Sequence, residues 1–147
     1  ILEDNNISSN YKLDLIRGSH IIINRRSGNG FFLEVPNERR IFFVLPYNKK
    51  TLIGTTEERQ TIGEQIKPSK KEIIYLINAY NAHFVKPISE KDITDSFSGL
   101  RPLIKSSSDP NKVTREYAIE MNKNLINVFG GKWTTARQLA KKVANSM

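Results

Sequence analysis

Four short apolar runs follow one another in the first third of the sequence and restrict its fold more than any other feature. The runs are rich in Ile, Val, Phe and Thr and span residues 13–23, 31–35, 40–46 and 51–55. Residues that favour turns separate them at 27–30 and 47–50. Short runs of this composition, bounded by turns, are typical of strands joined by tight connections. The sequence therefore predicts an antiparallel meander.

One amphipathic helix is predicted after the meander. Ser69 and Glu72 have the spacing of a capping box, in which each side chain bonds to the backbone of the other residue. Apolar residues then recur at helical spacing up to Phe84, and Pro87 ends the pattern. We expect a helix from Ser69 to about Phe84, in which His83 is a solvated or packing residue.

The last third of the chain returns to strand character. Residues 93–104 predict a strand, residues 105–112 a polar loop, and residues 114–121 and 125–129 two strands around a tight turn. A final helix is expected from Thr134, as its cap, to about Asn145. The predicted fold class is α+β, an antiparallel sheet with flanking helices.

Composition limits the functional classes. The chain is 38% hydrophobic, which is enough for one core, and it reads as one domain or a piece of a larger protein. The longest apolar runs fall short of the roughly 18 residues that span a bilayer. Cysteine is absent, so thiolate chemistry is excluded and a cytoplasmic protein is favoured. The spacing of His, Asp and Glu suggests no metal site.

The formal charge of +8 favours an anionic partner, such as a phosphate ester, a nucleotide, a lipid or nucleic acid. A nucleic-acid-binding module would need aromatic side chains on its surface between the cations. The aromatic residues Phe42, Phe43, Phe97 and Phe129 lie in apolar runs that predict a core. Nucleic acid is therefore ranked below the other partners.

Three cationic residues occur at or just after the ends of predicted strands: Arg101, Arg115 and Lys132. Converging side chains of this kind would bind a phosphate dianion, and three unrelated surface cations are the alternative. Lys132 also follows the glycine pair Gly130 and Gly131, where the backbone can approach a ligand at the start of a helix. His20 is a candidate general base, although spacing alone favours a structural histidine.

Six segments of the sequence together resemble a known enzyme family. They are Leu15-Ile16-Arg17-Gly18-Ser19-His20-Ile21, Arg40-Ile41-Phe42-Phe43-Val44-Leu45-Pro46, Leu52-Ile53-Gly54-Thr55-Thr56-Glu57, Phe97-Ser98-Gly99-Leu100-Arg101-Pro102-Leu103, Thr114-Arg115-Glu116-Tyr117 and Val128-Phe129-Gly130-Gly131-Lys132-Trp133-Thr134-Thr135. In this order they resemble the FAD-dependent (aerobic) glycerol-3-phosphate dehydrogenases. The resemblance covers residues 12–144 and only the C-terminal half of the family's dehydrogenase region.

The resemblance implies a fragment with the D-amino-acid-oxidase-like FAD fold. Residues 1–12 would be a flexible lead-in, 13–121 the substrate-binding (cap) domain, and 122–147 a strand and helix that return to the FAD-binding domain. The Gly-x-Gly-x-x-Gly turn that holds the FAD pyrophosphate has no counterpart here. The fragment alone is therefore expected to be inactive, and its exposed domain face could join copies into a homo-oligomer.

The resemblance also assigns the site residues. His20, Arg101 and Lys132 match catalytic positions, while Arg101, Arg115 and Lys132 match the substrate phosphate pocket. The cofactor-binding positions are Gly130, Gly131, Lys132 and Thr134. The implied reaction oxidises sn-glycerol 3-phosphate to dihydroxyacetone phosphate by hydride transfer to N5 of FAD. The electrons would pass to a quinone, in a parent protein peripheral to the cytoplasmic face of the inner membrane.

This sequence departs from the family pattern at three positions. Glu57 stands where Asp is common, Trp133 where Leu is usual, and Ala136 where an aromatic residue is frequent. The matched cations are all present. Two alternatives stay open: a related FAD-dependent oxidase of an amino or hydroxy acid, and a small basic module that binds an anion or nucleic acid.

Overall fold

The structure, a computed structural model, describes residues 2–105, 117–122 and 124–147. These residues form two compact units. Unit 1 comprises Ile1–Leu15 and Pro102–Met147, and unit 2 comprises Ile16–Arg101. The division falls within two long strands, β1 (Leu13–Ile23) and β6 (Ile93–Ile104). The units differ in their bounds from the division predicted at residues 12 and 121, and the functional roles of those segments stay predictions.

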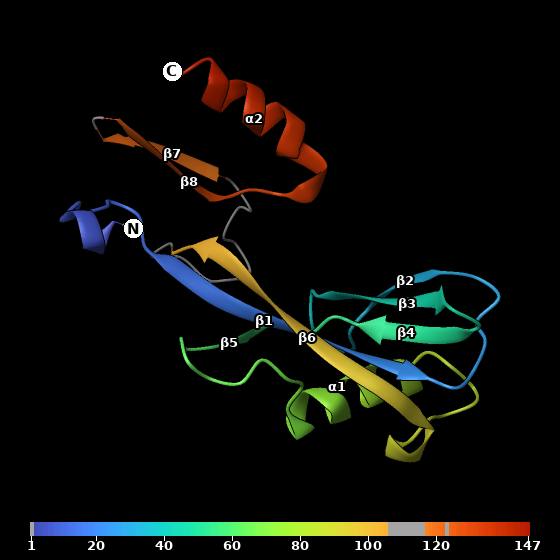
Figure 1. The fold of residues 1–147 in the computed structure, drawn as a ribbon. Coiled ribbons are helices and arrows are strands. Elements are labelled where there is room, and N and C mark those ends of the chain that lie inside the picture. Colours follow the sequence, from blue (N-terminus) through green and yellow to red (C-terminus); the bar gives the residue numbers. More distant parts are fainter. Residues whose placement is uncertain (1, 106–116, 123) are drawn as a thin grey trace. The chain divides into compact units, whose positions relative to one another are not determined.

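A six-stranded sheet forms the frame of unit 2 (Figure 1). Its order is β2 (Phe31–Glu34), β3 (Ile41–Tyr47), β4 (Lys50–Gly54), β1 and β5 (Glu58–Arg59), and β6 pairs with β1. Strands β2, β3 and β4 form an antiparallel meander as predicted, but β1, expected as the first strand of that meander, pairs with β4 instead of β2. Asn48 and Lys49, both with positive φ, form the two-residue turn between β3 and β4, a geometry that suits tight hairpins. The α+β fold class is confirmed.

One extra residue interrupts the pairing of β4 and β5 with β1. His20 lies opposite Gly54, and Arg17 lies opposite Glu58 rather than residue 57. This insertion is a β-bulge, which bends a strand and redirects its side chains. The bulge falls in the loop of residues 55–57, and strand β5 beyond it was not predicted. The loop carries Glu57 to the edge of the candidate site described below.

Helix α1 (Lys70–Asn81) packs on one face of this sheet (Figure 1). Alternate strand residues point toward it, and Ile21, Phe42 and Ile53 are fully buried with Leu76. The predicted capping box of Ser69 and Glu72 is confirmed. The helix ends at Asn81, three residues before the predicted end. The Asn81 amide bonds both backbone groups of Ile88 and fixes the chain that turns back toward the short helix η2 (Glu90–Asp92).

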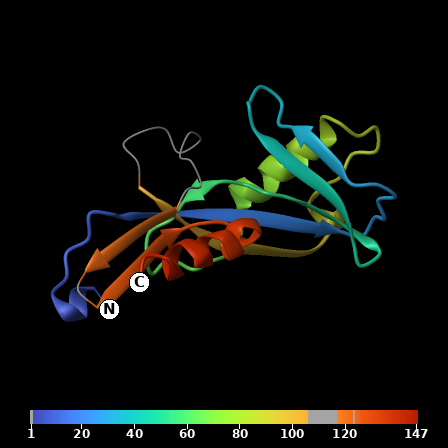
Figure 2. The ribbon, with the colours of Figure 1, turned by 90° about the horizontal axis from the view of Figure 1, so that it is seen from above.

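Unit 1 contains a β-hairpin followed by a helix (Figure 2). Strands β7 (Tyr117–Asn122) and β8 (Leu125–Gly130) pair antiparallel, and a short helix η4 (Trp133–Thr135) leads into α2 (Ala136–Ala144). The N-cap of α2 is Thr135, not Thr134, and its side chain bonds the carbonyl of Lys132 instead of capping. The predicted strand residues 114–116 lie outside the described residues.

The N-terminal segment contacts this hairpin within unit 1. The backbone N–H of Asn10 donates to the Glu120 carboxylate at 2.9 Å, and the ring centre of Tyr11 lies 5.5 Å from that of Phe129. A short helix, η1 (Glu3–Asn5), precedes these contacts. The flexibility expected of residues 1–12 stays a prediction.

Candidate functional site

The two faces of β1 carry different chemistry. Ser19 points toward α1, where its hydroxyl donates to the Glu72 carboxylate at 2.6 Å. His20, the next residue, points to the opposite face of the sheet and stacks on Phe97 of β6, with ring centres 4.8 Å apart. Because side chains alternate along a strand, one strand supplies both a buried anchor and a surface site. The candidate site is the face that carries His20.

His20 lies in a space that depends on a glycine in the neighbouring strand. A Cβ atom at Gly54 would lie 2.2 Å from Cδ2 of His20, so any larger residue would displace the ring. Nδ1 of His20 is buried and has no hydrogen-bond partner among the described residues. Burial, and then the charge of Arg101, lower the pKa of His20 below its ordinary value of 6.5. At neutral pH the imidazole is therefore mainly uncharged, the form that can accept a proton.

Arg101 lies on the same face as His20, over a second glycine. A Cβ atom at Gly18 would lie 2.7 Å from Nη2 of Arg101 and 2.6 Å from Oγ1 of Thr55. The guanidinium donates to Glu57 through Nη1 and to the carbonyl of Thr56 through Nη2, both at 3.0 Å. The structure thus brings together two of the predicted site residues, a proton acceptor and an anion-binding group.

A buried polar network supports β1 from the other face. Arg17 and Ser19 donate to the carboxylate of Glu72, which is 1% exposed, and Thr56 donates to it at 2.6 Å. Burial alone would raise the pKa of Glu72, but hydrogen bonds from Ser19, Thr56, the Ser69 backbone and Arg17 lower it to about 2. Glu72 is therefore ionised at neutral pH and ties α1 to the strand beneath His20.

The other predicted site residues lie elsewhere in the chain. Arg115 is outside the described residues. The other four belong to unit 1: Gly130 ends β8, and Gly131, Lys132 and Thr134 lie between β8 and α2. Both glycines have positive φ, 71° and 92°, a conformation that glycine adopts without strain. They turn the end of a strand into the start of a helix, and this arrangement fits the polar edge of a flavin because it presents backbone N–H groups and a lysine.

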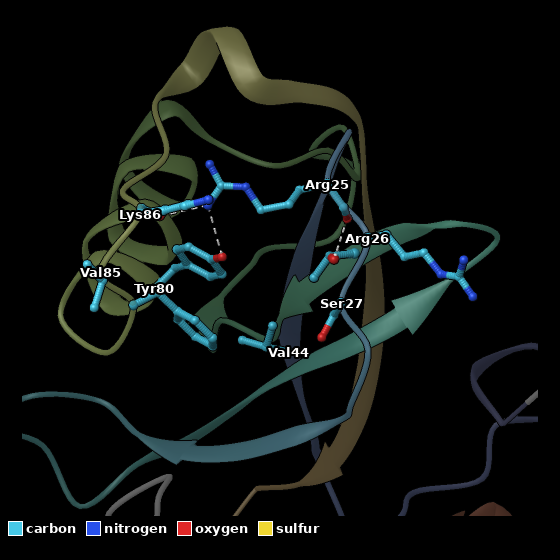
Figure 3. Close-up of a pocket in the computed structure, with 9 residues that line it drawn as sticks. Arg25, Arg26, Ser27, Val44, Tyr80, Val85 and Lys86 are labelled. Atoms are coloured by element: carbon cyan, nitrogen blue, oxygen red, sulfur yellow. Dashed lines mark hydrogen bonds between the residues drawn. The ribbon is translucent and has the colours of Figure 1, made fainter.

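A hollow of about 310 Å³ lies on the α1 side of the sheet, away from the face that carries His20 (Figure 3). Arg25, Lys86, Tyr80 and the core residue Val44 are among its lining residues. Nη1 of Arg25 donates to the carbonyl of Lys86 at 2.7 Å and to the hydroxyl of Tyr80 at 3.3 Å. Arg26 points away from the hollow (Figure 3). Arg25 thus fixes the loop after α1, and we place the candidate site at His20 and Arg101 instead.

The predicted placement of the aromatic residues was partly wrong. Phe42 is fully buried as expected, but Phe43 and Phe97 are 40% and 44% exposed. Both lie on the sheet face that carries His20. Exposed apolar residues continue across that face on β2 and β3: Phe32, Ile41, Leu45 and Tyr47. An apolar run cannot show which of its alternate residues is covered.

Sequence reasoning missed the acidic partners of the site. Glu57 was noted only as a departure from a family pattern, whereas its carboxylate contacts both Arg101 and Arg40. Glu72 was identified as a helix cap, but not as the buried partner of Arg17. Arginines inside strand-like segments are a signal for such carboxylates, because a half-buried guanidinium needs an anion.

Within the described residues, His, Asp and Glu form no group of three that could hold a metal ion. None of the helices that the structure describes is long and apolar enough to span a bilayer.

Comparisons with known proteins place the chain among flavoenzymes. A family model described as FAD dependent oxidoreductase matches residues 3–146. The chain is 38% identical to the aerobic glycerol-3-phosphate dehydrogenase of Escherichia coli over 144 residues, which are 92% of this chain and 29% of that protein. It is also 38% identical to the D-erythritol 1-phosphate dehydrogenase of Brucella abortus, over 92% of this chain and 28% of that protein. The chain thus spans about three tenths of the length of these relatives.

A solved structure has the same fold. The glycerol-3-phosphate dehydrogenase of Bacillus halodurans, complexed with FAD, superposes with a TM-score of 0.78. The sequences are 24% identical, and the match covers 99% of this chain and 28% of that one. At this identity the likeness concerns the fold, and it extends through both compact units.

Proposed function

The chain belongs to the family of FAD dependent oxidoreductases, and on that premise we propose that its parent protein oxidises sn-glycerol 3-phosphate to dihydroxyacetone phosphate. The observation that carries the proposal is the pairing of His20 with Arg101 on one sheet face. A substrate that is both an alcohol and a phosphate needs a proton acceptor and a bound cation close together. The names of the relatives support this substrate.

Each residue has a defined task in the proposed reaction. Oxidation of a secondary alcohol removes a proton from oxygen and a hydride from carbon. His20, uncharged at neutral pH, takes the proton of the C2 hydroxyl. Arg101 binds the phosphate with charge-assisted hydrogen bonds, and we assign Arg115 and Lys132 to the same anion on the basis of the family resemblance.

The cofactor is assigned to the turn between β8 and α2. Gly130, Gly131 and Thr134 supply backbone N–H groups to the flavin, and Lys132 supplies a positive charge beside it. FAD, when bound, accepts the hydride at its N5 atom. The 147 residues contain no Gly-x-Gly-x-x-Gly pattern for the pyrophosphate. We therefore propose that a longer protein supplies that part and that the chain alone is inactive.

The electron acceptor and the location of the parent protein are finer parts of the same proposal. We assign a quinone as acceptor and a peripheral position at the cytoplasmic face of the inner membrane. Phe32 and Phe43 are exposed apolar residues on the site face. Such a patch supports the proposal that this face is covered by another part of the parent protein or by a second copy of the chain.

A second candidate substrate is D-erythritol 1-phosphate. The relative that oxidises it is as similar to this chain as the E. coli enzyme, at 38% identity. Both substrates are polyol phosphates, and the erythritol ester is longer by one CHOH group. The residues that bind the phosphate and take the proton would be the same for both.

The test uses the longer protein that carries this chain, purified with its flavin. We expect glycerol 3-phosphate to bleach the flavin and to reduce an added dye. Arg101→Ala should raise KM strongly, and His20→Ala should mainly lower kcat. Arg26→Ala, which removes an exposed cation from the loop after β1, is the matched control and should change neither. A flavin-loaded protein that ignores glycerol 3-phosphate but oxidises D-erythritol 1-phosphate would favour the second candidate.

A further inference from the structure

Glu57 contacts the arginine of the candidate site through its carboxylate. We propose that Glu57 is a positioning residue, whose carboxylate holds the guanidinium of Arg101 in the orientation that receives the substrate phosphate. This inference rests on the proposed function, in which Arg101 binds that phosphate. Glu57 itself would not contact the reacting atoms.

Two contacts from one loop define the orientation of Arg101. Oε1 of Glu57 accepts from Nη1 at 3.0 Å, and the carbonyl of Thr56 accepts from Nη2 at 3.0 Å. A planar guanidinium that is bound through both terminal nitrogens has little freedom to rotate. Because Glu57 and Thr56 are consecutive residues, the loop of residues 55–57 acts as a clamp on the arginine.

Arg40 holds the same loop from its other side. Its Nη2 donates to the carbonyl of Thr55 at 2.7 Å, and its Nε lies 3.6 Å from Oε2 of Glu57. Arg40 is in turn packed against Tyr75 of α1, to whose hydroxyl it donates at 3.2 Å. The carboxylate of Glu57 therefore lies between two guanidinium groups, one fixed to the helix and one in the site.

The partial exposure of Glu57 and Arg101 indicates that their ion pair orients the arginine more than it stabilises the fold. The side chains of Glu57 and Arg101 are 28% and 29% exposed, so water screens their attraction. Ion pairs at such sites add little to folding stability. A long arginine side chain, however, loses much conformational freedom when it is ordered, so it stays mobile unless contacts hold it. Loss of Glu57 should therefore leave the fold intact and release Arg101.

The neighbouring residue Glu58 is a matched control. Its carboxylate bonds Lys71 at 3.1 Å, at a more exposed position. Glu58→Gln removes the same charge one residue away and leaves the contacts of Arg101 in place. Glu57→Asp is the conservative variant, because it keeps the carboxylate and shortens its reach by one methylene.

The direct test measures the order of the Arg101 Nε–Hε group by 15N relaxation NMR in the 147-residue chain. We expect a rigid group in the wild type and in Glu58→Gln, a mobile group in Glu57→Gln, and partial recovery in Glu57→Asp. An equally rigid Arg101 in Glu57→Gln would overturn the proposal. Loss of the folded state in Glu57→Gln would also overturn it, because the carboxylate would then be structural.

The functional test uses the longer, flavin-loaded protein. Glu57→Gln should raise KM for glycerol 3-phosphate about tenfold with kcat changed less than about threefold, and Glu57→Asp should recover most of the loss. A fall in kcat at unchanged KM would contradict positioning of the phosphate. If the wild type does not oxidise glycerol 3-phosphate, the proposed function fails, and the NMR comparison still decides whether Glu57 orients Arg101.

Discussion

Two glycines create the space in which the side chains of the candidate site lie. Gly18 is covered by the guanidinium of Arg101, and Gly54 by the ring of His20. Neither position has a positive φ, because both residues belong to regular strands, so the backbone conformation does not require glycine at either place. Their role is steric: the absence of a side chain on one strand lets a neighbour lie flat on the sheet.

Gly54→Ala should displace the ring of His20 and destabilise the chain. The new Cβ would overlap Cδ2 of His20, and such overpacking typically costs about 1–3 kcal/mol. Urea unfolding followed by circular dichroism measures the loss. Gly99→Ala is the control, because a Cβ there meets nothing within 4 Å and should leave stability unchanged or slightly higher. Equal stability of both variants would show that the ring of His20 is not held against Gly54.

His20 should titrate below 6.5, and its pKa should rise when Arg101 is replaced by Gln. The folded state disfavours the charged imidazole, so the chain should lose stability as pH falls from the unfolded pKa of His20, 6.5, toward its lower folded pKa. An NMR titration of the imidazole signals measures the pKa of His20 in the wild type and in Arg101→Gln. A pKa of His20 above 6.5 would contradict this account of the site.

At the scale of elements, one residue joins helix α1 to strand β1. Glu72 completes the capping box with Ser69 and also accepts hydrogen bonds from Arg17 and Ser19. The start of the helix is therefore fixed to the strand residues on either side of Gly18. This link explains how a helix on one face of the sheet can set the geometry of a site on the other face.

Glu72→Gln should destabilise the chain at neutral pH by about 3–5 kcal/mol, because it leaves Arg17 nearly buried without its anion. The wild type should lose stability as pH falls from about 4.5 to about 2, the range over which the unfolded but not the folded carboxyl takes up a proton. Urea titrations between pH 7 and pH 2 should show a flatter profile for the variant. Glu58→Gln, at an exposed ion pair, should change stability by about 1 kcal/mol or less. Similar losses in both variants would contradict the role given to Glu72.

Most elements could be predicted from the sequence, because their signals are local. The strand of residues 93–104 was predicted with the bounds of β6, and the capping box located the start of α1. The two-residue strand β5 and the bulge before it carry no local signal, since they depend on pairing with β1. The same is true of the site: His20 and Arg101 were identified as residues, whereas their contacts with Gly54, Phe97 and Glu57 depend on which strands are neighbours.

At the scale of the whole molecule, the buried apolar core belongs to one of the two units. Among the described residues, every buried hydrophobic side chain lies between Ile16 and Ile88, within unit 2. Among the described residues of the hairpin and α2 none is fully buried: Leu125 and Leu139 are half-buried, and most residues of α2 are exposed. Local stability follows buried apolar contacts, so the two units should differ in their resistance to opening.

Amide hydrogen exchange should therefore be faster in β7, β8 and α2 than in β1, β3, β4 and α1. The exchange of unit 1 amides requires only the opening of a hairpin and a nine-residue helix, whereas exchange in the unit 2 core requires near-global unfolding. Mass spectrometry of peptides from the exchanged chain measures both sets in one sample.

The same measurement on the longer protein with its flavin tests the proposed function independently of catalysis. If Gly130, Gly131 and Lys132 hold the cofactor there, protection should rise much more at residues 125–144 than in the core of unit 2. Equal protection of the two units in the isolated chain would contradict this distribution of stability, and an unchanged unit 1 in the flavin-loaded protein would contradict the assignment of its glycine turn to FAD.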